Sequence, residues 1–265
     1  MDKQHGNPNG LKEKLRTGEP SYVFAVRSIR DTGIVNIALA AQYDAVYIDF
    51  QHSPIALHEA ANVFHAGAHG GLTVLARVPA ADVSLVARCI DAGAHGLMLA
   101  DLRDAEQARR CVEAALLHPI GNRSFGMPVD PRFMGMSGAV LMQAINQATL
   151  LVAMIESEQA VDGAEAIAAI DGIDAVQIGT ADLSASMGVP GDYGHPRVQS
   201  AYRKVALACN AVKKPLIIGG IRNPAYLQPY IALGAVRCYF VGSDTGFLLD
   251  AARQAKSRLQ SDIPH

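Results

Sequence analysis

The regular alternation of eight short apolar runs with segments of helical periodicity is the feature that most constrains the fold. Short apolar runs bounded by turn residues are typical of buried parallel strands, and strands that alternate with helices predict βαβ units. Eight such units predict a single (β/α)8 barrel, which we expect over residues 21–265, with an open doubly wound sheet as the alternative. The predicted strands are 22–26, 45–48, 73–76, 96–99, 151–155, 175–178, 216–218 and 238–241.

Helical periodicity follows each strand, and a short helix is also expected at 11–16, within a flexible N-terminal tail over residues 1–20. Between residues 118 and 138 the periodicity stops, and a loop of this length inside a domain is usually functional. The remaining predicted helices are 34–41, 57–66, 83–92, 104–117, 139–148, 161–169, 197–211, 224–233 and 246–259.

Composition limits the class of protein. The chain has 265 residues, of which 50% are hydrophobic, and this is ample for a sizeable core. The formal net charge of -2, with Lys and Arg scattered, gives no basic face for nucleic acid and no polybasic membrane anchor. No apolar run approaches the roughly 20 residues that cross a bilayer, and the polar N-terminus lacks a signal-peptide core. We therefore expect a cytoplasmic protein with no nucleic-acid or membrane partner.

Four cysteines are present, and they are widely spaced with no C-x-x-C pair. Neither a zinc knuckle nor a disulfide framework is indicated by this spacing. We expect the thiols to be reduced and mostly buried.

Polar residues follow the predicted strands at the points where the strands end. In a (β/α)8 barrel the carboxyl ends of the strands meet at one mouth, where the active site lies. A scatter of polar residues over both ends would have argued against the barrel. The residues are Asp49 and His52 after strand two, Arg77 after three, Asp101 after four, Glu156 after five and Asp182 after six.

Two of these acids are candidates for a divalent metal site. Asp182 lies in IGTADLSASMG, which reads as a glycine-bordered loop after strand six, and Glu156 leaves strand five. Carboxylates at neighbouring strand ends point into one mouth, and with water and a bidentate ligand they would complete a site for Mg2+ or Mn2+. The alternative is that both acids cap the following helices.

The other polar residues each allow two interpretations. Arg77 emerges from a buried strand, where it either meets a substrate anion or forms an ion pair with an acid such as Asp49. His52 is either a general base or a solvated loop histidine. Asp91 is either a functional acid or a solvated acid at the end of a helix, and Arg123 in the long loop either binds a carboxylate or is simply exposed.

Six segments together resemble one known family. IDFQHSP, ARVP, DAGAHG, HPIGNRSFG, MIESEQA and IGTADLSASMG occur in the order and spacing of the HpcH/HpaI aldolases, over roughly residues 21–249. The resemblance implies a (β/α)8 barrel, a homohexamer built as a trimer of dimers, and a last helix exchanged between partners. It also implies a metal-dependent class II aldolase, with Mg2+, Mn2+ or Co2+, which cleaves a 2-keto-4-hydroxy acid to pyruvate or hydroxypyruvate and an aldehyde without a Schiff base.

The resemblance also assigns roles to residues. It implies that Glu156 and Asp182 are the metal ligands and that Arg77 steadies the enolate. It further implies that His52 is the base, with Asp91 of a neighbouring subunit as its partner. From its place after strand two, we expect Asp49 to be a further catalytic residue. The substrate-binding set that it implies is Arg77, Gln51, Arg123 and the backbone of Gly179, Thr180 and Ala181.

The sequence departs from the family pattern in three places. Gln51 stands where the family usually has a glutamate, and Val26 and Arg27 replace a glycine-tryptophan pair. The long loop has Ser124 after Arg123, where the family has glycine. Arg27 would add a cation at the distal end of the substrate. A citryl- or malyl-CoA lyase, a citrate-synthase-like or phosphonopyruvate mutase-like enzyme, and a non-catalytic keto-acid binder are therefore the alternative functions.

Overall fold

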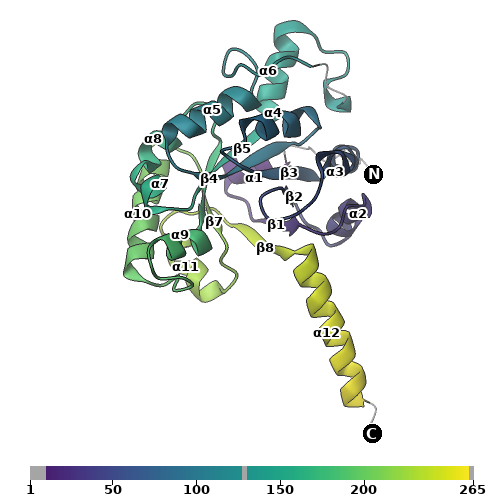
Figure 1. Cartoon of the computed structure of the whole chain (residues 1–265), viewed down its shortest axis with the longest axis vertical. Coiled ribbons are helices and arrows are strands. Elements are labelled where there is room, and N and C mark those ends of the chain that lie inside the picture. The colour runs from purple at the N-terminus through teal and green to yellow at the C-terminus, as the bar shows by residue number, and fades with distance from the viewer. Residues whose placement is uncertain (1–9, 127–129, 263–265) are drawn as a thin grey trace.

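Eight parallel strands form the predicted (β/α)8 barrel in the computed structural model, which describes residues 10–126 and 130–262 (Figure 1). Every strand begins within one residue of its predicted start. The strands are β1 (Ser21–Val26), β2 (Ala45–Asp49), β3 (Thr73–Pro79), β4 (Gly96–Leu102), β5 (Leu150–Ile155), β6 (Ala175–Gly179), β7 (Leu216–Gly219) and β8 (Cys238–Ser243).

The strand order is β7-β6-β5-β4-β3-β2-β1-β8, and each neighbouring pair is parallel. The two ends of this sheet, β7 and β8, approach each other. Just before β8, the N–H of Val236 donates a hydrogen bond of 2.8 Å to the carbonyl oxygen of Leu216 in β7. The sheet therefore closes nearly completely, and all eight strands place their carboxyl ends at one mouth.

Helices surround the barrel, and several begin at a side chain that caps the first turn. The carboxylates of Asp82 and Asp104 and the hydroxyl of Ser157 each accept a backbone N–H three residues later. The helices are α1 (Gly10–Thr17), α2 (Gly33–Ala40), α3 (Leu57–Gly70), α4 (Val83–Asp91), α5 (Ala105–Ala115), α6 (Gly138–Ala148), α7 (Glu158–Asp162), α8 (Ala164–Ala168), α9 (Thr180–Ser186), α10 (Pro196–Ala211), α11 (Pro224–Ala232) and α12 (Asp244–Asp262), with the 3-10 turn η1 (Pro131–Phe133) in the long loop.

Two sequence-based expectations about helices were wrong. The helix predicted at 161–169 is two short helices, α7 and α8, because the chain turns at Gly163. The stretch after strand six is not a loop, because Thr180 to Ser186 form α9. Its small and hydroxylated residues have weak helix propensity, but burial of Thr180, Leu183 and Ser184 holds the two turns in place.

The hydrophobic core has an inner layer inside the barrel and an outer layer between strands and helices. Alternate residues of β1 illustrate this: Val23 and Ala25 point into the barrel, whereas Phe24 and Val26 pack against the surrounding helices. The N-terminal helix α1 adds Leu11 and Leu15 to the inner cluster. Residues 10–17 are therefore folded onto the barrel; the first nine residues of the predicted tail lie outside the described residues.

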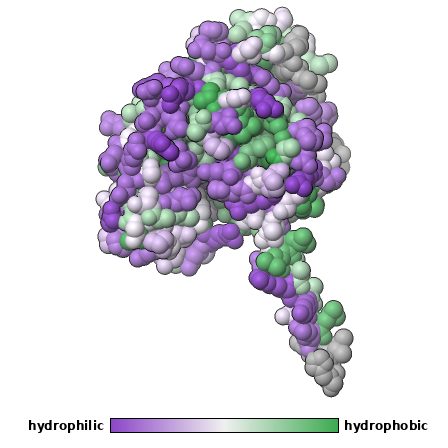
Figure 2. Space-filling view, in the orientation of Figure 1, coloured by the Kyte–Doolittle hydropathy of each residue, from purple (hydrophilic) through white to green (hydrophobic). Residues whose placement is uncertain are grey.

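The last helix, α12, extends away from the barrel and carries apolar side chains into solvent (Figures 1 and 2). Phe247, Leu248, Leu249 and Leu259 are all exposed on it. Apolar side chains that lie outside a hydrophobic core normally mark a surface that another element covers.

Two expectations about the class of protein can be compared with the fold. Among the described helices, none is both long and apolar enough to cross a membrane. All four cysteines are free and buried. Burial raises the pKa of the Cys89, Cys209 and Cys238 thiols to about 12, which keeps them unreactive in the folded chain.

Candidate active site

A cavity of about 210 Å³ opens at the carboxyl ends of the strands. Its floor is formed by Tyr47, Met98, Met154 and Phe240, and its polar lining includes residues from six strands or the loops that follow them. The polar or charged side chains in the lining are Arg27, His52, Arg77, Gln177, Thr180, Asp182, Arg222 and Ser243.

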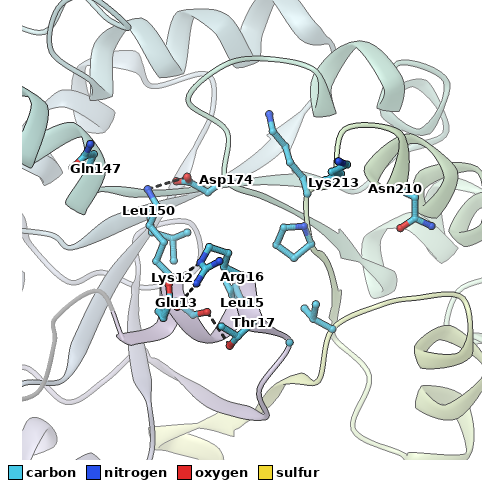
Figure 3. A pocket seen from close by; sticks show the side chains of 14 residues that line it. Lys12, Glu13, Leu15, Arg16, Thr17, Gln147, Leu150, Asp174, Asn210 and Lys213 are labelled. Atoms are coloured by element: carbon cyan, nitrogen blue, oxygen red, sulfur yellow. Dashed lines mark hydrogen bonds and ion pairs between the residues drawn. The ribbon is translucent and has the colours of Figure 1, made fainter.

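A larger cavity, of about 710 Å³, opens at the opposite end of the barrel, beneath α1 (Figure 3). Lys12 and Asp174 in this cavity form an ion pair of 2.9 Å, and Arg16 pairs with Glu13 within α1. Enzymes with this fold place their active sites at the carboxyl ends of the strands, and polar residues at the other end support stability. The smaller cavity is therefore the candidate active site.

Asp49 joins two of the cavity arginines. Its carboxylate is fully buried (0% exposed) and accepts two hydrogen bonds from Arg77, Nε to Oδ1 at 2.9 Å and Nη2 to Oδ2 at 2.6 Å. Arg27 Nε donates to Oδ2 at 2.7 Å. The ion pair that was the alternative interpretation of Arg77 is therefore present, yet Arg77 also lines the cavity. Asp49 thus positions both arginines.

These contacts fix the charges of the group. Burial alone would raise the pKa of Asp49, but the hydrogen bonds and charges of Arg77 and Arg27 outweigh it and hold the pKa of the carboxyl below its usual value. Burial likewise opposes the charge on Arg77, but its bonds to Asp49 raise the pKa of the guanidinium. Both groups remain ionised at neutral pH.

Glu156 and Asp182 approach each other across β5 and β6. Glu156 is only 7% exposed, and its Oε2 accepts a hydrogen bond of 2.6 Å from the N–H of Asp101, a residue with φ of 54°. Its Oε1 lies against Gly179, where a Cβ atom would come within 2.4 Å of it. Asp182 lies in the first turn of α9, which begins at the buried Thr180.

The charges around Glu156 indicate a site for a cation. Burial raises the pKa of Glu156, and the nearby carboxylate of Asp182 raises it further, against the opposing effects of the Asp101 N–H and Arg77. Two carboxylates that disfavour each other's charge become compatible when a divalent cation lies between them. No group of three or more His, Cys, Asp or Glu side chains suited to a metal was found among the described residues. The candidate donor set consists of the two carboxylates of Glu156 and Asp182, and such a set would leave positions for water and substrate.

Gly179, Thr180 and Ala181 also line the cavity. The Thr180 hydroxyl donates to the carbonyl of Gly219 at 2.6 Å, so the hydroxyl of Tyr202, also 2.6 Å away, is the donor in their contact. These two bonds fix the start of α9 through a side chain that is fully buried. The first N–H groups of a helix have no partner within the helix, and α9 begins at residues that line the cavity.

The residues after β2 divide into one that reaches the cavity and one that does not. His52 is exposed and lines the cavity, and its backbone N–H donates to Asp49 Oδ1 at 3.2 Å. Gln51 is not part of the lining. Its Oε1 is buried and has no hydrogen-bond partner among the described residues.

Asp91 and Arg123 lie elsewhere in the chain. They form an ion pair, Arg123 Nε also donates to the carbonyl of Ala115 at 2.9 Å, and both line a second cavity of about 210 Å³ beside His95. Asp91 ends α4, at the end of the barrel opposite the mouth. A single chain therefore does not bring Asp91 or Arg123 to His52.

Two cavity residues escaped the sequence analysis. Gln177 on β6 is 1% exposed, its Oε1 has no partner among the described residues, and it lies opposite Met154 of β5 in the register. The only signal was a single polar residue inside an apolar strand. Arg222 follows Gly219 and Gly220 after β7, and the strand-end rule that identified the other polar residues would have found it.

Comparisons with known proteins point to one family. The sequence profile of the HpcH/HpaI aldolase/citrate lyase family matches residues 28–246. The 4-hydroxy-4-methyl-2-oxoglutarate aldolase of Chaetomium globosum is 30% identical over 255 residues, which cover 92% of each chain. The 4-hydroxy-2-oxovalerate aldolase of Rhodococcus jostii is 34% identical over 242 residues, 91% of this chain and 92% of the relative. A crystal structure of an HpcH/HpaI aldolase from Desulfitobacterium hafniense has a TM-score of 0.86 at 28% identity and covers 96% of this chain and 97% of its own.

Proposed function

The chain belongs to the HpcH/HpaI aldolase/citrate lyase family, and from this premise we propose that it is a metal-dependent class II aldolase acting on a 2-keto-4-hydroxy acid. It breaks or forms the bond between C3 and C4, with pyruvate or hydroxypyruvate and an aldehyde as the other partners. The observation that carries this proposal is that Asp182 and Arg77 line one cavity at the barrel mouth and that the charges of both act on the buried Glu156.

The residues fit a resident metal ion, because Glu156 and Asp182 provide two carboxylates, neither of which forms an ion pair within the part of the chain that the structure describes. These two carboxylates would hold a Mg2+, Mn2+ or Co2+ ion, which would supply Lewis-acid chemistry to the keto acid. The N–H groups at Thr180 and Ala181, beside Gly179, receive the carboxylate of the keto acid. Gln177 adds a buried amide on the same side.

His52 transfers the proton in this reaction, and Arg77 stabilises the negative charge that develops. His52 takes the proton from the C4 hydroxyl, and the C3–C4 bond breaks as the C4 oxygen becomes a carbonyl. The electron pair of that bond passes to the pyruvate part, and Arg77 stabilises the resulting enolate oxygen. The proton held by His52 then goes to C3, which gives pyruvate and restores the neutral base. Asp49 keeps the Arg77 guanidinium in place through two hydrogen bonds. Among the described residues that line the cavity there is no lysine to form an imine.

The assembly and location are part of the same proposal. We place the protein in the cytoplasm as a homohexamer, a trimer of dimers in which α12 is exchanged between partners. The exposed Phe247, Leu248 and Leu249 on α12 support exchange, because a neighbouring barrel would cover them. Assembly would also carry Asp91 to the His52 of a neighbouring subunit and Arg123 to its substrate. Family membership does not identify the aldehyde, since the two relatives are named for a dicarboxylic and a monocarboxylic keto acid.

The test is pyruvate release from a 4-hydroxy-2-oxo acid, followed with Mg2+ or Mn2+ and after exhaustive EDTA treatment. We expect activity only with metal, and a loss of at least ~100-fold in Glu156→Gln because a metal ligand is removed. Glu158→Gln is the matched control, since Glu158 is exposed and pairs with Arg197 outside the cavity. Activity that survives chelation, or equal activity of Glu156→Gln and the wild type, would reject the mechanism.

A further inference from the structure

We propose that Arg27 and Arg222 form a subsite for a second carboxylate of the substrate. On this inference, which rests on the proposed function, the enzyme prefers 4-hydroxy-2-oxo dicarboxylic acids and releases an oxo acid as its carbonyl product. The two arginines lie at the rim of the cavity, and neither contributes to the candidate metal site.

The topology places the two arginines on one side of the mouth. Arg27 follows β1 and Arg222 follows β7, and β8 lies between these two strands in the barrel. The end of β8 contributes Gly242 and Ser243 to the cavity lining between the arginines. Small residues at this point leave room for a ligand group between two guanidinium groups. The candidate metal ligands lie on the neighbouring arc of the mouth, at β5 and β6.

Arg27 is held by two acids that leave its terminal nitrogens available. Its Nε donates to Asp49, and its Nη atoms form no hydrogen bond with any described residue. The backbone N–H groups of Arg27, Ser28 and Ile29 donate to the carboxylate of Asp244, at 2.8 to 3.0 Å. The loop after β1 is therefore fixed, while the arginine side chain remains 39% exposed at the cavity.

Arg222 lacks a counterion of its own. Within the part of the chain that the structure describes, it forms no hydrogen bond or ion pair, yet its charge acts on the hydroxyl group of Tyr47 on the cavity floor. Gly220, with φ of 81°, makes the turn that brings this residue from β7 to the mouth. A cation close to a buried floor and without an acidic partner is suited to an anionic ligand.

The charges of the cavity require a second anion for balance. Three arginines line it, and Asp49 neutralises one of them. Glu156 and Asp182 balance a divalent cation, and the carboxylate of the keto acid balances one more arginine. Three arginines against these two anions leave one positive charge unbalanced, on the side of the cavity where Arg27 and Arg222 lie. A second substrate carboxylate neutralises it, whereas a neutral aldehyde would not.

The test compares two substrates that differ at one group. Cleavage of 4-hydroxy-2-oxoglutarate releases pyruvate and glyoxylate, and cleavage of 4-hydroxy-2-oxopentanoate, with a methyl in place of the second carboxylate, releases pyruvate and acetaldehyde. We expect the wild type to favour the dicarboxylate by ~100-fold in kcat/KM, and Arg222→Gln and Arg27→Gln to lose at least ~10-fold of that preference. Arg203→Gln, an exposed change on α10, is the control that leaves the preference unchanged.

Binding provides a readout that does not need turnover. With Mg2+ present, 2-oxoglutarate should bind the wild type at least ~10-fold more tightly than 2-oxopentanoate, and Arg222→Gln should abolish the difference. Equal kcat/KM for both substrates, or equal affinity for both keto acids, would overturn the subsite while leaving an active aldolase intact. If neither substrate is cleaved, the proposed function fails, and the binding ratio still decides whether the subsite exists.

Discussion

The buried charged and polar side chains of this protein fall into two kinds. Some have their hydrogen bonds and charge matched by neighbouring residues, and others do not. Asp49 and Arg77 satisfy each other through two hydrogen bonds, and such a pair keeps a guanidinium oriented inside a barrel. Glu156 and Gln177 each have a buried group whose neighbours in the chain leave it incompletely compensated. Groups of this second kind cluster at functional sites, because a ligand completes them.

His95 gives a prediction about pH at the residue scale. Its Nδ1 accepts the N–H of Val74 at 3.0 Å, and burial lowers the pKa of the ring to about 3. The folded chain therefore binds fewer protons than the unfolded chain between pH 6.5 and 3. The stabilisation by His95 is complete above pH 6.5 and is lost as the pH falls.

Urea unfolding of the wild type and His95→Gln at pH 7 and pH 5 measures this effect. The wild type should lose about 2 kcal/mol more than the variant between these two pH values. His58→Gln, a change at an exposed histidine on α3, should follow the wild type. An identical pH dependence for the wild type and His95→Gln would show that His95 is not a buried neutral ring.

The sequence predicts where the candidate site residues lie better than it predicts which residues they form hydrogen bonds with. The presence of a polar residue at or shortly after the end of an apolar strand made Arg77, Glu156 and Asp182 candidates, because strand ends share one mouth in this fold. The bond from Arg27 to Asp49 joins β1 to β2, and no spacing rule predicts which acid an arginine meets across strands. Gln177 was not predicted as a cavity residue, because the register of β6 decides whether its side chain points into the barrel or outward.

At the scale of elements, α9 gives the site its shape. Gly179 precedes it, and the absence of a side chain there makes room for the Oε1 atom of Glu156. The strands were predictable because buried apolar runs in parallel sheets are nearly continuous. α9 was not, because seven residues rich in Ala, Ser and Thr are stabilised by packing rather than by propensity.

Replacement of Gly179 by alanine tests this element. The φ of Gly179 is -81°, so alanine fits the backbone, but its Cβ would lie 2.4 Å from Glu156 Oε1 and force the carboxylate to move. We expect a folded protein whose affinity for Mn2+ falls at least ~10-fold, measured by calorimetric titration. Gly163→Ala is the matched control, since its nearest neighbour would be 3.7 Å away. Unchanged Mn2+ affinity in Gly179→Ala would remove Glu156 from the metal site.

At the scale of the whole molecule, the two ends of the barrel have different roles: one supports the fold, and the other carries the candidate active site. The amino end is closed by α1, and its main ion pairs are formed within the chain. The carboxyl end gathers arginines, acids and one histidine around a cavity. A single chain leaves Asp91, Arg123 and the apolar side of α12 away from that cavity, which is why the proposed function includes a hexamer. The barrel follows from the alternation of strands and helices in the sequence, whereas contacts between subunits leave no such pattern.

The central claim is that Glu156, Asp182 and Arg77 act on one ligand. A crystal structure of the protein with Mn2+ and pyruvate measures this directly, because the anomalous signal of the metal locates it independently of the refined side chains. We predict one Mn2+ ion bound by the carboxylates of Glu156 and Asp182, with the pyruvate carboxylate at Thr180 and Ala181 and the keto oxygen within hydrogen-bond distance of Arg77. A metal ion bound elsewhere, or pyruvate out of reach of Arg77, would contradict the account.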